Sequence, residues 1–347
     1  MEIVKESINS KRVSRFIQKN EFALVYYTPD YLLFLESISP KSEIYYLCVT
    51  NENDKILGLI PVAQLSNETK GTIINSLPFF GSHGGVLFDD KVELKNEILK
   101  LLINEISNIK NDLLSITIIE NPFNLMDESI MKDCDFECID KRLGQFKFLF
   151  PNEEINVIGE KLMDSFHSKT RNAIRKGSTF SPKIKECYLN DTIRWIQKVH
   201  EKSISKINGS FKTIGDFENL FKFFPSPSMS RIFIAELNNE PVAGLIVLLY
   251  KNTVEYFTPV IEEEYKHTQL LSKLIFEIMI ILSHEGYEIW NWGGTWESQK
   301  GVYRFKERFG SITKTYRYFN REIDNNIRQL SKKNLDNHFK YYYAYKF

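Results

Sequence analysis

A hairpin pattern that occurs twice constrains this chain more than any other feature of its sequence. In each copy, two hydrophobic, strand-like runs flank a short polar turn. The first copy covers 45–49 and 55–62, and the second covers 231–237 and 241–249. A glycine, Gly58 or Gly244, stands on the second run of each copy. Two copies of one pattern predict two copies of one folded module.

The segments after each hairpin also match in order and type. A further strand, an amphipathic helix and a hydrophobic strand follow, at 72–77, 92–109 and 113–119 in the first copy and at 253–260, 270–282 and 287–292 in the second. The second helix is the clearer one, because its leucines and isoleucines recur at three-and-four spacing and Gly286 follows as a stop signal. A last strand that joins the sheet through a helical crossover makes each copy an α/β unit. We therefore predict an α/β fold of two tandem modules, with mixed sheets flanked by helices.

The boundary between the modules is predicted near Phe150 and Pro151, where a strand ends and a helical segment begins. We expect a first module over 1–150, a second module with the main motifs over 151–320, and a helical tail over 321–347. The end of the tail, 340–347, is basic and aromatic. This composition suits docking back onto the first module or contact with a membrane interface, and we prefer docking.

The overall composition excludes several classes of protein. Lys plus Arg and Asp plus Glu are equal at 45 each, so no net field draws the chain to DNA or to an anionic membrane. The first residues lack the apolar core of a signal peptide, and no run approaches the roughly 18 apolar residues of a membrane span. We therefore expect a cytoplasmic protein. Cys134 and Cys138 have no second ligand pair nearby, so no metal site is expected and the cysteines are interpreted as reduced thiols.

Three segments carry glycines and cations in distinctive arrangements. The first is a proline-aromatic loop that ends in Gly84-Gly85, over 77–86, and the second is a basic helix end, Lys-Thr-Arg-Asn-Ala-Ile-Arg-Lys-Gly, over 169–177. The third is Asn-Trp-Gly-Gly-Thr at 291–295, followed by Lys-Gly-Val-Tyr-Arg-Phe-Lys-Glu-Arg-Phe-Gly at 300–310. All three resemble motifs of the FemABX family, whose members are tandem GNAT-fold acyltransferases with BioF-like relatives. The resemblance covers nearly the whole chain, and the last motif is the most specific.

The resemblance implies a tandem GNAT-like fold and transfer of an activated acyl group to an amine. Well-known members take amino acids from aminoacyl-tRNA and add them to a peptidoglycan precursor, whereas BioF-like and exopolysaccharide-associated relatives use other acyl donors. We therefore expect acyl-CoA or aminoacyl-tRNA as co-substrate, with no tightly bound cofactor. The expected acceptor is an amine of an envelope or glycan precursor. tRNA is a candidate partner, DNA is not, and membrane contact is at most peripheral.

Two departures from the family pattern bear on the chemistry. Asn291 stands where the family has an aspartate, so no carboxylate at that position can act as a base. Ordinary GNAT enzymes also carry a glycine-rich loop before the long helix to cradle the coenzyme A pyrophosphate. The equivalent stretch here, 265–270, has no glycine, so coenzyme A would have to bind differently.

The candidate catalytic residues are Lys306, Gly293 and Gly294. Gly293 and Gly294 follow a buried strand and are predicted to leave main-chain N–H groups free to polarise an acyl carbonyl; the alternative is a tight turn. Lys306 lies on a predicted amphipathic helix with Val302, Phe305 and Phe309 facing inward. The resemblance implies that its charge stabilises the oxyanion, and the alternative is a solvated lysine.

The candidate substrate-binding residues form three groups. Arg171, Arg175 and Lys176 are predicted to clamp phosphates, although a helix end also favours cations for structural reasons alone. His83 and Gly84 are expected in a loop that borders a cleft, because small neighbours cannot bury the imidazole, and a simple hydrogen-bonding loop is the alternative. The remaining candidates lie in the third motif: Asn291, Trp292, Thr295, Tyr303 and Phe305.

Two hypotheses of different classes remain open at the level of sequence. The first is an N-acyltransferase or aminoacyltransferase. The second is a catalytically degenerate double module that only binds an envelope precursor or a protein partner, as Asn291 and the missing glycine loop would allow. Transfer from labelled donors to amine acceptors separates the two.

Overall fold

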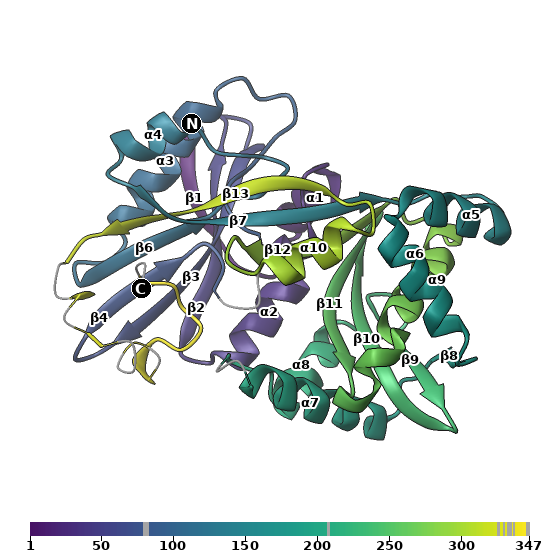
Figure 1. Ribbon diagram of the computed structural model, residues 1–347. Coiled ribbons are helices and arrows are strands. Elements are labelled where there is room, and N and C mark those ends of the chain that lie inside the picture. The colour runs from purple at the N-terminus through teal and green to yellow at the C-terminus, as the bar shows by residue number, and fades with distance from the viewer. Residues whose placement is uncertain are drawn as a thin grey trace. The chain divides into compact units, whose positions relative to one another are not determined.

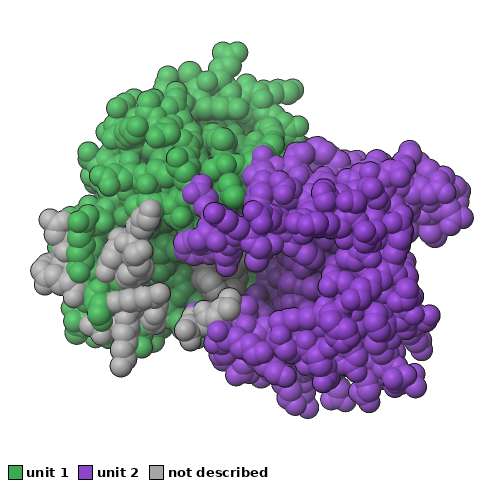
Figure 2. Space-filling model, in the orientation of Figure 1, with its two compact units in different colours: residues 1–143, 314–347 green, residues 144–313 purple. Residues whose placement is uncertain are grey.

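The computed structural model describes residues 1–78, 83–206, 209–324, 327–328, 330–331, 335 and 337–344. The chain forms two compact units (Figures 1 and 2): unit 1 comprises residues 1–143 and 314–347, and unit 2 comprises residues 144–313. The chain leaves unit 1 within strand β7 (Glu137–Phe148) and returns to it within strand β13 (Ile312–Glu322). The first division thus falls within a strand, before the expected boundary at 150, and the segment from 314 onward belongs to unit 1.

Unit 1 is built on a mixed sheet with the strand order β1-β2-β3-β4-β6-β13, and β5 pairs with β3. Its other strands are β1 (Glu2–Glu6), β2 (Ser42–Thr50), β3 (Ile56–Asn67), β4 (Gly71–Asn75), β5 (Leu87–Phe88) and β6 (Leu113–Ile119). Its helices are α1 (Lys11–Lys19), η1 (Val25–Tyr27), α2 (Pro29–Ile38), α3 (Lys95–Ser107) and α4 (Glu128–Asp133). The pair β4–β6 is parallel, whereas β1–β2, β2–β3, β3–β4 and β6–β13 are antiparallel.

Unit 2 repeats this plan with the strand order β12-β11-β10-β9-β8. Its strands are β8 (Lys183–Glu186), β9 (Ser230–Leu237), β10 (Glu240–Tyr250), β11 (Thr253–Ile261) and β12 (Ile289–Trp296). Its helices are α5 (Ile155–Ser165), α6 (Ser168–Ser178), α7 (Asn190–Ser205), α8 (Ile214–Phe223), η2 (Glu263–Thr268), α9 (Leu270–His284) and α10 (Lys300–Glu307). The pair β11–β12 is parallel, like β4–β6 in unit 1.

The predicted repeat and the predicted α/β class are therefore confirmed. Hairpin, strand, helix and parallel strand occur as β2–β3, β4, α3 and β6 in unit 1 and as β9–β10, β11, α9 and β12 in unit 2. The two glycines are an exception to the correspondence. A Cβ on Gly58 would lie 2.7 Å from Ile98 of α3, whereas a Cβ on Gly244 would meet Trp195 of α7, on the other face of its sheet. Each glycine thus lets a different helix pack closely against its strand, α3 at Gly58 and α7 at Gly244.

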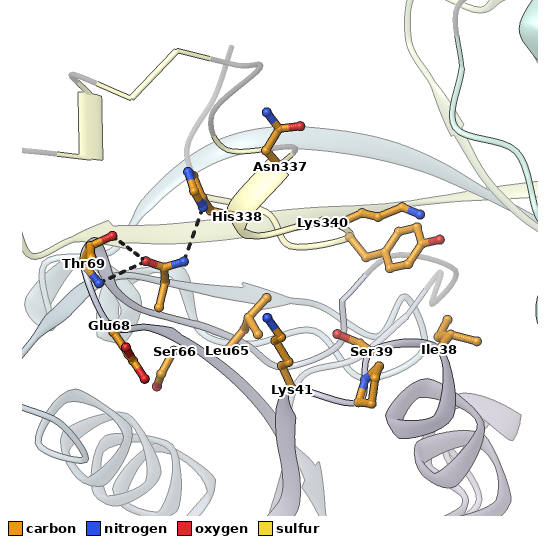
Figure 3. Close-up of a pocket in the computed structure, with 13 residues that line it drawn as sticks. Ile38, Ser39, Lys41, Leu65, Ser66, Glu68, Thr69, Asn337, His338 and Lys340 are labelled. Carbon is orange, nitrogen blue, oxygen red and sulfur yellow. Dashed lines mark hydrogen bonds between the residues drawn. The ribbon is translucent and has the colours of Figure 1, made fainter.

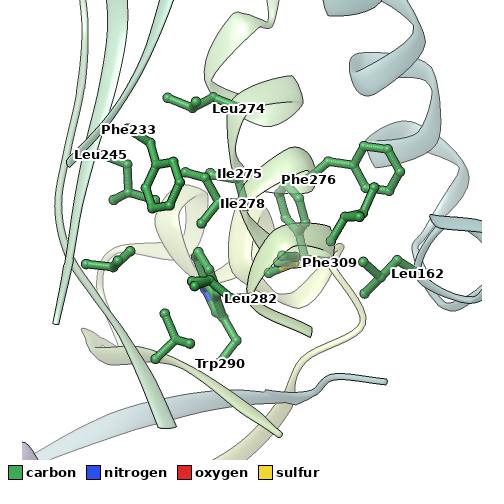
Figure 4. Close-up of a cluster of buried hydrophobic side chains, with 14 of the residues drawn as sticks. Leu162, Phe233, Leu245, Leu274, Ile275, Phe276, Ile278, Leu282, Trp290 and Phe309 are labelled. Carbon is green, nitrogen blue, oxygen red and sulfur yellow. The ribbon is translucent and has the colours of Figure 1, made fainter. Parts of the chain in front are cut away.

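The crossover helix α9 carries the core of unit 2. Its side chains Leu274, Ile275 and Ile278 point toward Leu245 and Phe233 of the sheet (Figure 4). Trp290 of β12 is fully buried beneath the same helix. Removing apolar surface from water stabilises a fold by about 25 cal/mol per Å². These contacts therefore hold α9 against the sheet. The start of β12 is thereby fixed, and the glycines that follow it are held at the edge of the core.

The C-terminal segment packs on unit 1. Ile327, Leu335, Phe339 and Ala344 form a small apolar cluster with Leu65, Ile73 and Leu114 of β3, β4 and β6. The carbonyl of Tyr343 accepts hydrogen bonds from the side chains of Asn75 and Thr117, and its N–H donates to Asn75 Oδ1. The last residues, 345–347, lie outside the described part of the chain. Within the described part, no helix combines the length and the apolar character that crossing a bilayer requires.

Candidate functional site

Lys306 is buried at the centre of the third motif. Only 6% of the residue is exposed, and its Nζ donates a hydrogen bond to Thr295 Oγ1 at 2.8 Å. The carbonyl oxygen of Gly294 lies 3.5 Å from the same ammonium. Gln145 completes the arrangement, because its Nε2 donates to the carbonyl of Tyr303 at 3.1 Å while Thr295 reaches its Oε1 at 3.4 Å. The alternative of a solvated lysine is therefore wrong.

Burial lowers the pKa of Lys306 from its ordinary value to about 8. The partners of its ammonium among the described residues are the uncharged Thr295 hydroxyl and Gly294 carbonyl, so within that part of the chain it is a buried cation without a counter-ion. A buried cation is costly unless an anion compensates it. The site is thus suited to a ligand or intermediate that brings a negative charge.

A second buried lysine in unit 2 provides a useful contrast. Burial also lowers the pKa of Lys147 to about 8, and its Nζ donates to Ser165 Oγ at 2.7 Å. Its ammonium, however, lies over the rings of Phe166 and Phe150, at 5.2 and 5.8 Å from their centroids. These cation–π contacts compensate part of its charge. We therefore interpret Lys147 as a structural residue and not as a second candidate for the catalytic lysine.

The glycine pair at the end of β12 corrects one prediction. Gly293 has a φ of 71°, a left-handed conformation that favours glycine, and its N–H donates to Asn291 Oδ1 at 2.8 Å. That N–H is consequently not free to polarise a carbonyl, contrary to the prediction for Gly293. The amide of Asn291 caps the turn through its oxygen, while its Nδ2 is buried and makes no hydrogen bond with the described residues.

The predicted aromatic residues form a packed wall beside the lysine. Trp292 contacts Phe305 and Phe309, with ring centroids 6.1 and 5.1 Å apart, and Tyr256 at 4.9 Å. Phe305 and Phe309 face inward as predicted, but Val302 is exposed, so this part of the helix prediction is wrong. The helix turns Lys306 inward in place of Val302. Tyr303 remains at the surface and shares a hydrogen bond of 3.2 Å with Thr313.

The strands β11 and β12 separate directly beside this wall. Their parallel pairing runs from Thr253 and Ile289 to Glu255 and Asn291 and then stops, although both strands continue. A register shift against β10 leaves Phe257 as an extra residue on β11. Such a bulge disrupts the ladder and frees backbone groups, and bulges are common next to active sites. The separating ends of the two strands thus offer main-chain and side-chain groups to a ligand.

The basic helix α6 has a definite place in unit 2. Its glycine, Gly177, packs so tightly on α9 that a Cβ there would lie 2.8 Å from Lys273 Cβ and 3.0 Å from the carbonyl of Gln269. The exposed Arg175 and Lys176 therefore stand near the first turn of α9, whose N–H groups favour anions. Unlike these two exposed cations, Arg171 is held by the chain itself: its guanidinium donates a hydrogen bond to the carbonyl of Phe166, just before the helix begins.

The structure contradicts the expectation for His83. The imidazole is fully buried in unit 1, edge-on to Tyr26 and Tyr316, whose ring centroids lie 5.6 and 4.9 Å away. Its neighbours in sequence are small, but tyrosines distant in sequence cover it. The carbonyl of Gly84 accepts a hydrogen bond from the hydroxyl of Tyr27. The preceding part of this motif, 79–82, lies outside the described residues.

Unit 1 also contains an open pocket of about 820 Å³ between the β3–β4 turn and the C-terminal segment (Figure 3). Asn67 is one of its lining residues, and its Nδ2 is 3.3 Å from His338 Nδ1. Lys41 and Lys340 line it, and no predicted site residue does. Within the described ranges, no group of histidines, cysteines and carboxylates is arranged to hold a metal ion, and the four cysteines are free.

Sequence reasoning missed several buried polar residues of unit 2. Glu255, in the middle of β11, is 1% exposed, and a charge inside a hydrophobic strand is a signal that could have identified it. Gln145 and Lys147 gave no such signal, because they lie on β7, whose pattern resembles an ordinary half-exposed strand. The hydroxyl of Thr258 is also buried without a hydrogen-bond partner among the described residues.

No protein-family model matches the chain, and no curated protein matches it in sequence. Solved structures, in contrast, match nearly its whole length. The crystal structure of FemX matches with a TM-score of 0.72 at 11% identity, over 95% of this chain and 99% of FemX. The chain has the tandem GNAT fold of FemX.

Two further structures share this FemX-like fold. A tandem GNAT protein from the clavulanic acid biosynthesis pathway matches with a TM-score of 0.57 at 9% identity, over 92% of this chain and 98% of its own. L-PGS from Bacillus licheniformis matches with a TM-score of 0.53 at 10% identity, over 97% of this chain and 98% of its own. At these identities the likeness establishes the fold alone.

Proposed function

We propose that this protein is an N-acyltransferase that moves an acyl or aminoacyl group from an activated donor to an amine. The donor is acyl-CoA or aminoacyl-tRNA, and the acceptor is an amine of a cell-envelope precursor or glycan. The FemX-like fold supports the reaction class. The single observation that carries the proposal is the ammonium of Lys306, which is buried beside Thr295 and Gly294 and to which no described residue brings a counter-charge.

The chemistry needs one stabilised intermediate. The acceptor nitrogen attacks the carbonyl carbon of the donor ester or thioester, a C–N bond forms, and negative charge develops on the carbonyl oxygen. The ammonium of Lys306 stabilises that oxyanion in a site of low dielectric constant. The C–O or C–S bond then breaks, and the leaving hydroxyl or thiol takes a proton equivalent to the one that the amine loses. Fixing both reactants side by side supplies much of the remaining rate.

Both candidate donors carry phosphates. Arg175 and Lys176 at the end of α6, close to the first turn of α9, provide cations and N–H groups for them. Arg171 lies one turn before Arg175 on the same helix, and the guanidinium donors that do not bind the Phe166 carbonyl add to this site. Because no glycine-rich loop precedes α9, these side chains take over part of the work of such a loop. Both donors are cytoplasmic, and we assign the protein to that compartment.

The test is transfer from labelled donors. Purified protein is incubated with radiolabelled acetyl-CoA or with radiolabelled aminoacyl-tRNA, and with amine-bearing envelope precursors as acceptors. The proposal predicts label in the acceptor, and sensitivity to ribonuclease identifies tRNA as the donor. Absence of transfer with every pairing would reject the proposal.

That negative result would favour a module that only binds an envelope precursor or a protein partner. One observation supports this second function: the oxygen of Asn291 is committed to capping Gly293, which is a structural role. Retained binding of an acceptor without transfer would distinguish it from an unfolded or incomplete enzyme.

A further inference from the structure

The two modules end their parallel strand pair in the same way. In unit 1 the last paired residues are Asn75 of β4 and Thr117 of β6. In unit 2 they are Glu255 of β11 and Asn291 of β12. The residues just before them, such as Ile74 and Val254, belong to the cores beneath the crossover helices, so each polar pair lies on the opposite face of its sheet.

In unit 1 this polar pair binds a peptide group. Asn75 Oδ1 accepts a hydrogen bond from the backbone N–H of Tyr343 at 2.7 Å, and Asn75 Nδ2 donates to the carbonyl of Tyr343 at 2.8 Å. Thr117 Oγ1 donates to the same carbonyl at 3.0 Å. The chain's own C-terminal segment thus shows which chemistry fits this position: an N–H with a carbonyl oxygen beside it.

In unit 2 one member of the equivalent pair, Asn291, still has a hydrogen-bond donor to offer. Asn291 is fully buried, and its Nδ2 has no hydrogen-bond partner among the described residues. A carboxylate, Glu255, replaces the amide of Asn75 as the acceptor. His200 on α7, which packs on β11, also has a buried ring nitrogen, Nε2, without a described hydrogen-bond partner. Buried polar atoms without partners are rare in native proteins and call for an explanation.

We infer that Glu255 and Asn291 bind an amine together with the carbonyl oxygen next to it. Glu255 accepts from the nitrogen, and its charge favours an ammonium over a neutral amide, while Asn291 Nδ2 donates to the carbonyl. The ligand class is therefore an α-amino acyl group, as in an amino acid or the amino-terminal residue of a peptide. Such a group is present in an aminoacyl donor or in a peptide acceptor. The inference deepens the proposed function and rests on it for the identity of the reaction.

The first test uses two small probes that differ only in the amine. Alaninamide carries the amine and the carbonyl, and propanamide carries the carbonyl alone. Saturation-transfer NMR on the full chain is expected to show alaninamide binding at least about tenfold tighter, as expected for a hydrogen bond to a charged group. Glu255→Gln, which keeps the shape, removes this preference. An unchanged preference in Glu255→Gln, or no binding of alaninamide to the wild type, would overturn the inference.

Asn291→Asp tests the carbonyl half of the site. The variant keeps the oxygen that caps Gly293 but loses the Nδ2 donor, so binding of both probes is expected to weaken. Equal melting temperatures of the variants and the wild type show that the fold is intact. Undiminished binding by a folded Asn291→Asp protein would contradict the role given to Nδ2.

Two larger probes distinguish the source of the amine. An adenosine with a 3′-alanylamide stands for the end of an aminoacyl donor, and an alanine-initiated tripeptide stands for an acceptor. Weaker binding of either one to Glu255→Gln supports the inference and assigns the amine to that substrate, and no change in both overturns it. Glu255-dependent binding without transfer would retain this inference and reject the proposed function. Transfer activity together with probe binding that Glu255→Gln leaves unchanged would retain the proposed function and reject this inference.

Discussion

The ammonium of Lys306 lies 2.8 Å from the hydroxyl of Thr295, the last buried residue of β12. The hydroxyl fixes the direction of the ammonium without neutralising it. No described residue supplies a counter-charge, so a substrate that develops negative charge beside the ammonium would be stabilised.

The transfer rate should fall in alkaline solution as Lys306 loses its proton. Burial lowers the pKa of Lys306 to about 8, so the cation is present below that pH and lost above it. Lys306→Arg keeps its charge, and its residual activity should lack this decline. The pH profiles of single-turnover rates, measured with one donor and one acceptor, check the difference. Identical alkaline limbs for both proteins would contradict the assignment.

The buried charge of Lys306 should lower the stability of the protein, although it raises the transfer rate. Because the pKa is lower in the folded state, the unfolded chain binds more protons between about pH 8 and 10.5, and the free energy of unfolding rises with pH across this window. Lys306→Met removes the buried charge, and at pH 7 it should stabilise the protein by about 1–2 kcal/mol after the loss of the Thr295 hydrogen bond. The gain should shrink toward pH 10. Urea unfolding at both pH values measures it, and a destabilised variant at pH 7 would contradict the prediction.

Asn75 should be important for the stability of unit 1. Asn75→Leu leaves the N–H of Tyr343 without its acceptor, weakens the hold on its carbonyl, and should lower the free energy of unfolding by about 2–4 kcal/mol. Asn108→Leu is the matched control, because Asn108 is exposed and its side chain donates to the carbonyl of Asn104 in the adjoining helix α3. Urea denaturation should separate the two variants clearly. Equal losses would mean that the C-terminal segment contributes little.

Cations at the end of α6 should determine the salt dependence of donor binding. The double variant Arg175→Gln, Lys176→Gln is expected to weaken binding of the donor about tenfold near 50 mM salt and to flatten its dependence on ionic strength. Lys169→Gln removes a charge at the other end of the same helix and should have little effect. Equilibrium binding at two salt concentrations provides the comparison. Equal effects of the end and start variants would contradict a local phosphate site.

The sequence predicted the two modules because their order depends on local patterns. Hairpins, crossover helices and the position of Lys306 after β12 all follow from spacing within short windows. The burial of Lys306 did not follow. Strand β12 extends to Trp296, beyond the predicted end at 292, so Thr295 lies on the strand. From there its hydroxyl accepts a hydrogen bond from Lys306, which holds the lysine inward.

Contacts between distant segments explain the remaining differences. His83 has small neighbours in sequence, and its burial depends on Tyr26 and Tyr316, which no local pattern connects to it. Asn291 was identified, yet its pairing with Glu255 depends on where the parallel ladder ends, which only the folded sheet defines. The sequence thus located the motif, and its neighbours required the fold.

Two buried lysines of unit 2 separate a catalytic ammonium from a structural one. Lys306→Met and Lys147→Met each remove an ammonium whose pKa burial lowers to about 8, and each leaves a hydroxyl without its donor. Single-turnover transfer is measured for both, with one labelled donor and one acceptor. Lys306→Met is expected to slow transfer by about 10²–10³-fold, as for loss of an oxyanion partner, while Lys147→Met should stay within a few-fold of the wild type. Near-wild-type transfer by Lys306→Met, or equal losses in both variants, would contradict the central role of Lys306.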